Sequence, residues 1–114
     1  MESILISIKK LLGLDKEYTC FDNDVIIHIN SVLATLTQLG VGPSEGFQIT
    51  DSSATWNEFI SGSTQLNAVK TYVYVKVRLI FDPPTSSGTI TAFNELAKEL
   101  EWRLNVAAET NYDD

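Results

Sequence analysis

The chain has 114 residues, which is enough for one domain with a modest core. Its formal net charge is −7, and 8 basic against 15 acidic residues argue against the Lys and Arg clusters with which proteins bind nucleic-acid phosphates. No apolar run approaches the roughly 20 residues that cross a bilayer, and a single cysteine excludes an internal disulfide. We therefore expect a globular, cytosolic protein without a membrane partner.

The first two predicted elements are helices. In residues 2–12 the apolar side chains share one helical face, and a glycine follows as a typical helix end. Residues 22–40 carry apolar side chains at spacings of four and three, and Gly40 is a natural end. Asp22 or Asn23 can cap the start. The stripe of this second, long amphipathic helix consists of Val25, Ile29, Val32, Leu36 and Leu39.

Residues 41–55 form a long predicted loop. Glycine and proline mark turns near its start, and the alternation of apolar with polar residues in 47–50 predicts a short extended segment. Thr55 and Glu58 have the spacing of a capping box, which opens a single helical turn. Long ordered loops in compact domains are disproportionately functional, so the apolar side chains of this loop are candidates for binding.

Residues 64–81 fit two secondary structures. Alternating apolar residues predict a strand: Val73, Val75, Val77 and Leu79. A helical stripe runs through the same segment: Leu66, Val69, Val73, Val77 and Ile80. The segment is long for a strand, and Asp82-Pro83-Pro84 ends it sharply. Periodicity alone favours a buried helix and leaves the strand open.

Residues 85–105 predict another long helix. Its apolar stripe consists of Ile90, Phe93, Ala97, Leu100 and Leu104. On the solvated face Glu99 and Arg103 are four residues apart and form a favourable pair. Residues 106–114 are polar and acidic, as expected of a tail that frays unless a partner orders it. The pattern predicts a mainly α fold, a small bundle of four main helices in one domain (1–105) followed by the tail.

No pattern in the sequence supports catalysis. His28 is the single histidine and Cys20 the single cysteine, and one of each cannot build a zinc site within a chain. We expect His28 to be structural and Cys20 to be a small, semi-buried apolar residue. The acid pair Glu95 and Glu99 lies on an exposed helix face, without the burial that tunes a carboxylate for acid–base work. The prediction is a protein that is not an enzyme and has no cofactor and no metal.

Aromatic side chains exceed what four short helices need for one core. They lie in the loop and on the second faces of the long helices: Phe47, Trp56, Phe59, Tyr72, Tyr74 and Trp102. Surplus apolar surface often marks a protein interface. The alternative, that these residues complete the core, stays equally open.

Several motifs together resemble one protein family. Residues 70–87 read KTYVYVKVRLIFDPPTSS, and residues 99–105 read ELEWRLN. Four shorter motifs belong to the same ordered series: HINSV at 28–32, LGVGP at 39–43, Gly46-Phe47 and Thr55-Trp56. This series, over residues 1–105, resembles the small head–tail connector (adaptor, or head-completion) proteins of tailed phages that infect Gram-positive bacteria. The number and order of the motifs carry the resemblance, because none is a catalytic signature.

The resemblance implies a helical fold, which favours helix for residues 64–81. It also implies a structural protein of the virion neck, made in the bacterial host cytoplasm, that forms a closed ring of about twelve identical subunits beneath the portal protein. In such connectors the carboxyl-terminal part binds the portal. The loop contacts neighbouring subunits or a tail-side stopper or tail-completion protein. DNA is expected to pass through the lumen without specific binding.

Carried onto this chain, the resemblance implies two sets of contact residues. The subunit or tail-side interface consists of Phe47, Ile49, Trp56 and Phe59. The portal interface consists of Trp102, Asn105, Tyr112, Asp113 and Asp114. A second hypothesis rests on the acidic charge and the tail: a small helical protein-binding module or regulatory protein with no virion role. Neighbouring genes distinguish the two hypotheses.

Overall fold

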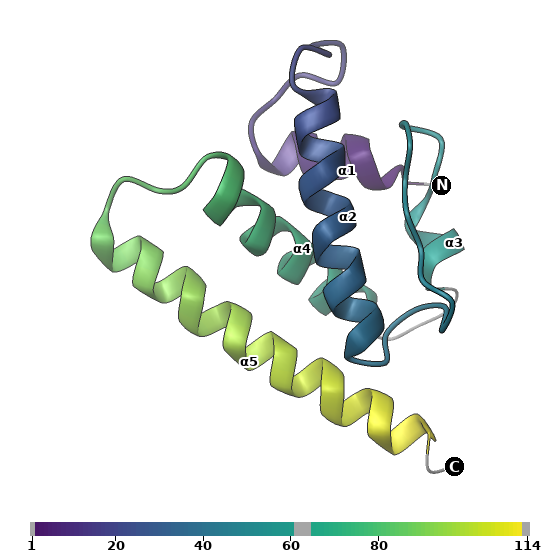
Figure 1. The fold of residues 1–114 in the computed structure, drawn as a ribbon. Helices are drawn as coiled ribbons and strands as arrows, with labels where there is room; N and C mark the ends of the chain where they lie inside the picture. Colours follow the sequence, from purple (N-terminus) through teal and green to yellow (C-terminus); the bar gives the residue numbers. More distant parts are fainter. Residues whose placement is uncertain (1, 61–64, 113–114) are drawn as a thin grey trace.

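The computed structural model describes residues 2–60 and 65–112, with side chains described as far as Ala108. Within these residues the chain forms five helices, of which the third is a single turn (Figure 1): α1 (Ile4–Leu11), α2 (Asp22–Gln38), α3 (Trp56–Phe59), α4 (Leu66–Phe81) and α5 (Ser87–Tyr112). The described parts of the chain contain no strand. The predicted mainly α fold with four main helices is confirmed.

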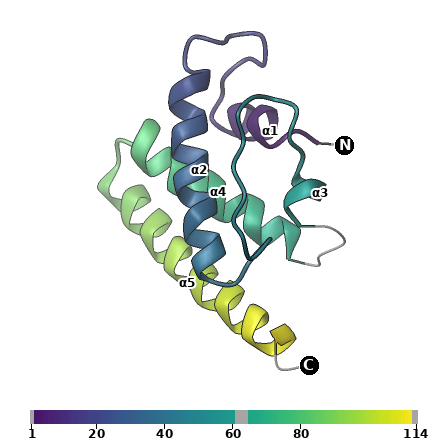
Figure 2. The same ribbon diagram turned by 45° about the vertical axis from the view of Figure 1, so that its right-hand side comes forward.

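Helix α4 lies at the centre of the bundle. Figures 1 and 2 show α5 running antiparallel along one side of α4, while α2 crosses α4 on its other side. Helix α1 packs against both α2 and α4. The loop after α2 lies on the far side of α2 from α5 in both views. Helix α4 therefore has packing partners on several faces.

This central position explains why the sequence of α4 fits two patterns. A surface helix buries one stripe, whereas α4 buries Val69, Val73 and Val77 of the helical stripe, Val75 of the strand pattern, and Tyr72, which belongs to neither. Because α1 and α2 cover one side and α5 covers another, α4 needs apolar residues around most of its circumference. The helix interpretation is confirmed, and the helix ends at Phe81, before the two prolines.

A buried lysine joins α1 to the start of α2. Lys9 is 1 % exposed, and its Nζ donates hydrogen bonds to the carbonyls of Lys16 (3.1 Å) and Tyr18 (2.8 Å). The Asp22 carboxylate lies 2.8 Å from the same nitrogen. Helix α2 has Phe21 as its N-cap, with no side-chain hydrogen bond. The predicted side-chain cap of α2 is therefore wrong, and Asp22 instead pairs with the lysine that holds the connection between the two helices.

The segment predicted to be extended, residues 47–50, is held by a side chain rather than by a strand. Asn30 of α2 donates from Nδ2 to the Ile49 carbonyl at 2.9 Å and accepts from the Ile49 backbone N–H at 2.8 Å. Because the amide satisfies both backbone groups of Ile49, the segment needs no strand partner. The predicted alternation is seen in burial: Ile49 is buried, and Gln48 and Thr50 on either side are exposed.

The end of the loop is fastened to the start of α1. The Trp56 backbone N–H donates to the Glu2 carbonyl at 3.2 Å. Thr55 caps α3 in the predicted capping box: its hydroxyl accepts from Glu58 N at 3.3 Å, and its own N–H donates to Glu58 Oε1 at 2.9 Å. The loop thus begins at α2 and ends against α1, which makes it part of the packed subunit.

Helix α5 is longer than predicted. It continues past Asn105 to Tyr112, so the helix does not end at the predicted boundary between domain and tail. The predicted pair of Glu99 and Arg103 is present, with Oε1 and Nη2 2.9 Å apart. Figure 1 shows the carboxyl end of α5 extending beyond the other helices. This end therefore offers a surface separate from the core.

Candidate interaction surfaces

The loop side chains predicted to contact other subunits are buried within their own subunit. Trp56 and Phe59 are 2 % exposed, and Ile49 is 1 % exposed. The indole of Trp56 is hydrogen-bonded to Ser7 of α1. A side chain enclosed by its own core has no surface to offer a neighbour. The structure therefore places these three residues in the core, which for Trp56 and Phe59 is the alternative that the sequence left open, and we do not assign them to an interface.

Phe47 is half-buried and packs on this core. Its ring meets the Phe59 ring edge-on, with 5.4 Å between centroids. Gly42 passes beside the same ring: a Cβ added to Gly42 would lie 2.5 Å from Phe59 Cε1. The φ of Gly42 is +81°, which favours glycine independently of the space. Two rings and one glycine thus hold the first half of the loop in place.

Two of the predicted portal residues lie in the described part of α5. Trp102 is 67 % exposed, more than any other large apolar side chain described, and Val106 one turn later is 39 % exposed. Asn105 is half-buried and donates from Nδ2 to the Leu39 carbonyl at 3.4 Å, which holds α5 against the end of α2. The remaining predicted portal residues lie beyond Ala108, the last described side chain: Tyr112, Asp113 and Asp114. Trp102 and Val106 define an exposed apolar stripe, called here the α5 stripe.

A buried tyrosine binds the opposite face of α5 to α4. Tyr72 has no exposed surface, and its hydroxyl donates to Glu101 Oε2 at 2.7 Å. Burial, and secondly the hydrogen bond to Glu101, raises the pKa of Tyr72 above the usual tyrosine range. Tyr74 is half-buried and its ring contacts Phe93. Of the three aromatic residues predicted on the second helix faces, Trp102 alone is largely exposed.

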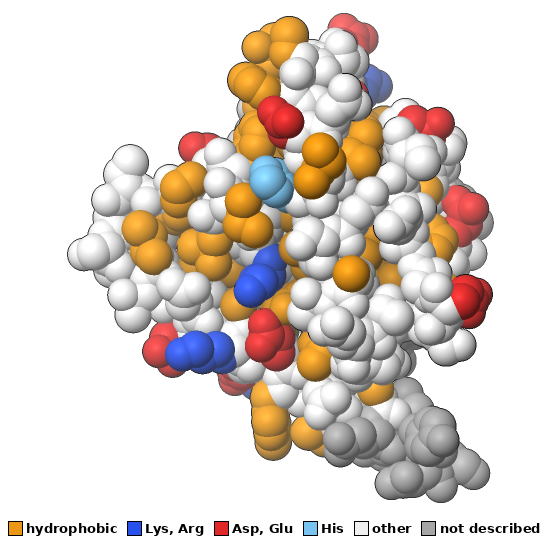
Figure 3. Space-filling model, in the orientation of Figure 1, with side chains coloured by type: hydrophobic (Ala, Val, Ile, Leu, Met, Phe, Trp, Pro, Cys, Tyr) orange, Lys and Arg blue, Asp and Glu red, His pale blue; other side chains and the backbone are white. Residues whose placement is uncertain are grey.

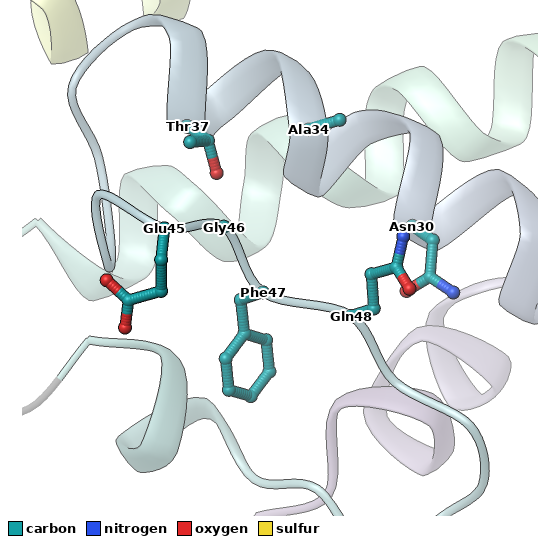
Figure 4. A pocket seen from close by; sticks show the side chains of 7 residues that line it. All are labelled: Asn30, Ala34, Thr37, Glu45, Gly46, Phe47 and Gln48. Atoms are coloured by element: carbon teal, nitrogen blue, oxygen red, sulfur yellow. The ribbon is translucent and has the colours of Figure 1, made fainter.

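A pocket of about 410 Å³ lies between α2 and the loop (Figure 4). It is lined by Asn30, Ala34, Thr37, Glu45, Gly46, Phe47 and Gln48. The Asn30 amide and the Thr37 hydroxyl are already hydrogen-bonded within the chain. Glu45 is the one charged side chain of this lining, and Figure 4 shows the Phe47 ring turned away from α2. The pocket therefore lacks the pair of converging charged groups that acid–base chemistry needs.

The single histidine and the single cysteine belong to no metal site: among the described residues, no group of three or more His, Cys, Asp or Glu could hold an ion. His28 is half-buried, and its ring contacts Phe81 at 6.4 Å between centroids. Cys20 is exposed, so the expectation of a semi-buried residue is wrong: the connection between α1 and α2 packs on Lys9 through backbone carbonyls and leaves the Cys20 side chain open to water. A side-chain hydrogen bond with Cys20 raises the pKa of Tyr18.

A partly exposed aromatic surface lies where α2 begins and α4 ends. Four rings contact one another in series and are called here the aromatic cluster: Tyr18, Phe21, Phe81 and His28. The centroid distances are 5.7 Å from Tyr18 to Phe21 and 5.5 Å from Phe21 to Phe81. Figure 3 shows hydrophobic side chains on both sides of the pale blue histidine, over α2 and the adjoining end of α4.

The aromatic cluster was not predicted, because its rings come from three separate segments of the chain. Each ring taken alone fits an ordinary core position. The available signal was Ile27, an apolar residue off the stripe of α2, and the structure leaves it 63 % exposed. An isoleucine on the solvated face of a helix stands out only when the neighbouring element is known.

A family model described as phage connector protein matches residues 4–111 of the chain. No curated protein and no solved structure matches it. The matched span begins at the first residue of α1 and ends one residue before the end of α5. Within the described ranges, none of the helices combines the length and the apolar character needed to span a membrane.

Proposed function

The chain belongs to the phage connector protein family, and from this premise we propose that it forms a ring of about twelve copies between the portal and the tail-side proteins of a tailed phage. The family makes it a structural connector protein of a virion. The finer assignment is head completion: the ring docks on the portal protein, and a stopper or tail-completion protein follows on the tail side. We propose no catalytic role.

The observation that carries the proposal is the span of the family match. Residues 4–111 include all five helices of the subunit almost completely. The sequence match therefore extends over nearly the whole subunit and does not rest on a single motif. The pocket beside α2 supports a non-catalytic role, since its lining has one charged side chain.

We assign the portal contact to the α5 stripe together with residues 109–114. Trp102 is 67 % exposed, and the end of α5 that follows it extends beyond the other helices. Exposed aromatic residues that become buried in a complex are typical centres of binding energy. Asn105 fixes the position of this surface on the subunit, because its hydrogen bond to the Leu39 carbonyl keeps α5 against the end of α2.

The acidic composition supports a ring through which DNA passes. Each subunit contributes a net charge of −7, and a ring multiplies this charge around its lumen. A negative surface repels phosphates, so DNA would move through without specific binding.

Mixing the purified chain with the portal protein of the same phage, followed by negative-stain imaging, tests the proposal. Rings seated on the portal are expected. A chain that stays monomeric and never binds the portal would contradict it, whereas a monomer in isolation is compatible with assembly on the partner. Trp102→Ala should weaken portal binding and leave the fold intact. Ile6→Ala, at an exposed position of α1 (36 % exposed), is the control that should bind normally.

The regulatory alternative has a test of its own. Portal, capsid and tail genes beside the coding gene are expected for a connector. A regulatory operon in that place, together with failure to bind the portal, would favour the small protein-binding module.

A further inference from the structure

We propose that the aromatic cluster, together with Ile27 and Ile80, docks a protein segment whose apolar side chains are flanked by lysine or arginine. The inference rests on the proposed function, since it assigns this segment to another protein of the same virion neck and not to a second copy of the chain.

The surface takes apolar side chains from the connection between α1 and α2, from α2 and from α4. Phe21, at the end of the connection between α1 and α2, contacts Phe81 at the end of α4. Ile27 on α2 is 63 % exposed, and Ile80 beside Phe81 is 55 % exposed. Apolar side chains gathered on one face, which the subunit leaves open to water, mark a site for another protein (Figure 3). The rings add aromatic contact area, which protein interfaces favour.

Three acidic side chains lie next to members of this surface in the chain. Glu17 precedes Tyr18, and Asp82 follows Phe81. Asp24 lies one helical turn before Ile27 on the same side of α2. All three carboxylates are exposed, and they are called here the acidic rim. An apolar surface with an acidic rim is complementary to apolar side chains flanked by positive charge, and such complementarity determines which partner binds.

A second copy of the chain fits the acidic rim poorly, because its cations are mostly engaged. Five of the eight basic side chains have partners: Lys9 with Asp22, Lys70 with Glu2, Lys76 with Glu101, Arg78 with Tyr74 and Arg103 with Glu99. The other three lie on separate elements: Lys10 on α1, Lys16 before α2 and Lys98 on α5. With five of its eight basic side chains already paired, a second copy has little positive charge to offer the rim, and we assign the positive charge to a different protein.

Cys20 provides a direct measurement of this surface. It is the single cysteine of the chain, it is exposed, and it lies between Tyr18 and Phe21. The rate of maleimide alkylation is measured for the chain alone, with the portal protein, and with the tail-side protein of the same phage. One of these two proteins should slow alkylation about tenfold or more, because a docked segment covers the thiol.

Two variants test whether the apolar surface carries the binding. Ile27→Ser and Ile80→Ser change exposed side chains, so both variants should fold, which thermal unfolding verifies. Each should weaken the Kd for the same partner about tenfold. Ile6→Ser is the matched control, an exposed isoleucine on α1, and should bind like the unmodified chain.

The outcomes separate the inference from the proposed function. If both proteins bind while the two variants bind normally and Cys20 stays reactive, the docking surface is overturned and the connector role stands. If neither protein binds, the connector role fails and the inference fails with it. Protection of Cys20 in the chain alone, rising with its concentration, would identify the occupant as a second copy and overturn the assignment to a basic partner.

The charge argument has a separate control. Glu17→Lys should weaken binding several-fold, and added salt should weaken binding of the unmodified chain. Glu95→Lys places the same change at an exposed position of α5 and should have little effect. Equal affinities for the two variants would overturn the role of the acidic rim.

Discussion

The indole Nε1 of Trp56 donates a 2.7 Å hydrogen bond to Ser7 Oγ inside the core. The Ser7 hydroxyl in turn donates to the Ile4 carbonyl at 3.0 Å, so the serine is fully used. The contact joins α3 to α1 across 49 residues of sequence and closes the long loop against the bundle. A loop tied down in this way is a structural part of the subunit.

Trp56→Ala should therefore destabilise the subunit itself. Removing a buried tryptophan leaves a cavity and takes the indole donor away from Ser7 Oγ, and we expect the free energy of unfolding to fall by about 3–5 kcal/mol. Urea unfolding followed by circular dichroism measures the change.

The second tryptophan of the chain is the matched control for this experiment. Trp102 is 67 % exposed, and Trp102→Ala should change the unfolding free energy by less than about 0.5 kcal/mol. Equal losses in the two variants would contradict the placement of Trp56 in the core and Trp102 at the surface.

Lys9 is the second residue whose role depends on burial. Its Nζ binds two carbonyls and the Asp22 carboxylate, and Lys9→Met leaves all three without their cation. Because the Asp22 side chain is 25 % exposed and water replaces part of the interaction, we expect a loss of about 2–3 kcal/mol in unfolding free energy. Lys10→Met, at the exposed neighbouring position, should be almost neutral in the same urea titration. Similar values for both variants would show that the ion pair contributes little.

The helices were predictable because local patterns determine them. Each signal determines the structure of residues close to it in the sequence. These signals are the apolar spacings of three and four, the capping box at Thr55 and Glu58, and the prolines after Phe81. Even α4 was predicted as a helix, although its burial on several sides imitates a strand pattern. The turn at Gly40 was predicted for the same local reason, and its φ of +87° confirms it.

Which side of each helix is exposed to solvent was not predictable, because exposure depends on how distant segments of the chain pack. Nothing in the sequence around Lys9 indicates burial, but the connection up to Asp22 folds over it. Trp56 looked like surplus surface, but α1 supplies its partner. Conversely, Phe21 and Phe81 form an exposed surface because two chain segments meet at the edge of the core. Pattern analysis identifies apolar residues, and only packing distinguishes core from interface.

Gly42→Ala should destabilise the loop through backbone strain and through a steric clash. Gly46→Ala is the control that has the strain without the clash. Both Gly42 and Gly46 have positive φ, so alanine at either position costs about 1–2 kcal/mol in backbone strain. At Gly42 the new Cβ also meets the Phe59 ring at 2.5 Å, whereas nothing lies within 4 Å at Gly46. We expect Gly42→Ala to lose about 1–3 kcal/mol more unfolding free energy than Gly46→Ala. Indistinguishable urea midpoints would show that the Phe59 ring moves aside freely.

Tyr72 should make stability fall at high pH. Burial, and then its hydrogen bond to Glu101, raises its pKa in the folded chain above the ordinary value of about 10. Because the unfolded chain releases this proton above about pH 10 and the folded chain retains it, the stabilising contribution is complete below that pH and is lost as pH rises toward the folded pKa.

Comparison with Tyr72→Phe isolates this effect from the titration of lysines, which both proteins share. The variant should be less stable at neutral pH by about 1 kcal/mol, because Glu101 loses its donor. Its urea midpoint should then fall less steeply between about pH 9 and 11 than that of the unmodified chain. Parallel curves over this range would mean that Tyr72 ionises equally in both states, and the contact between α4 and α5 would then have to open to water before the subunit unfolds.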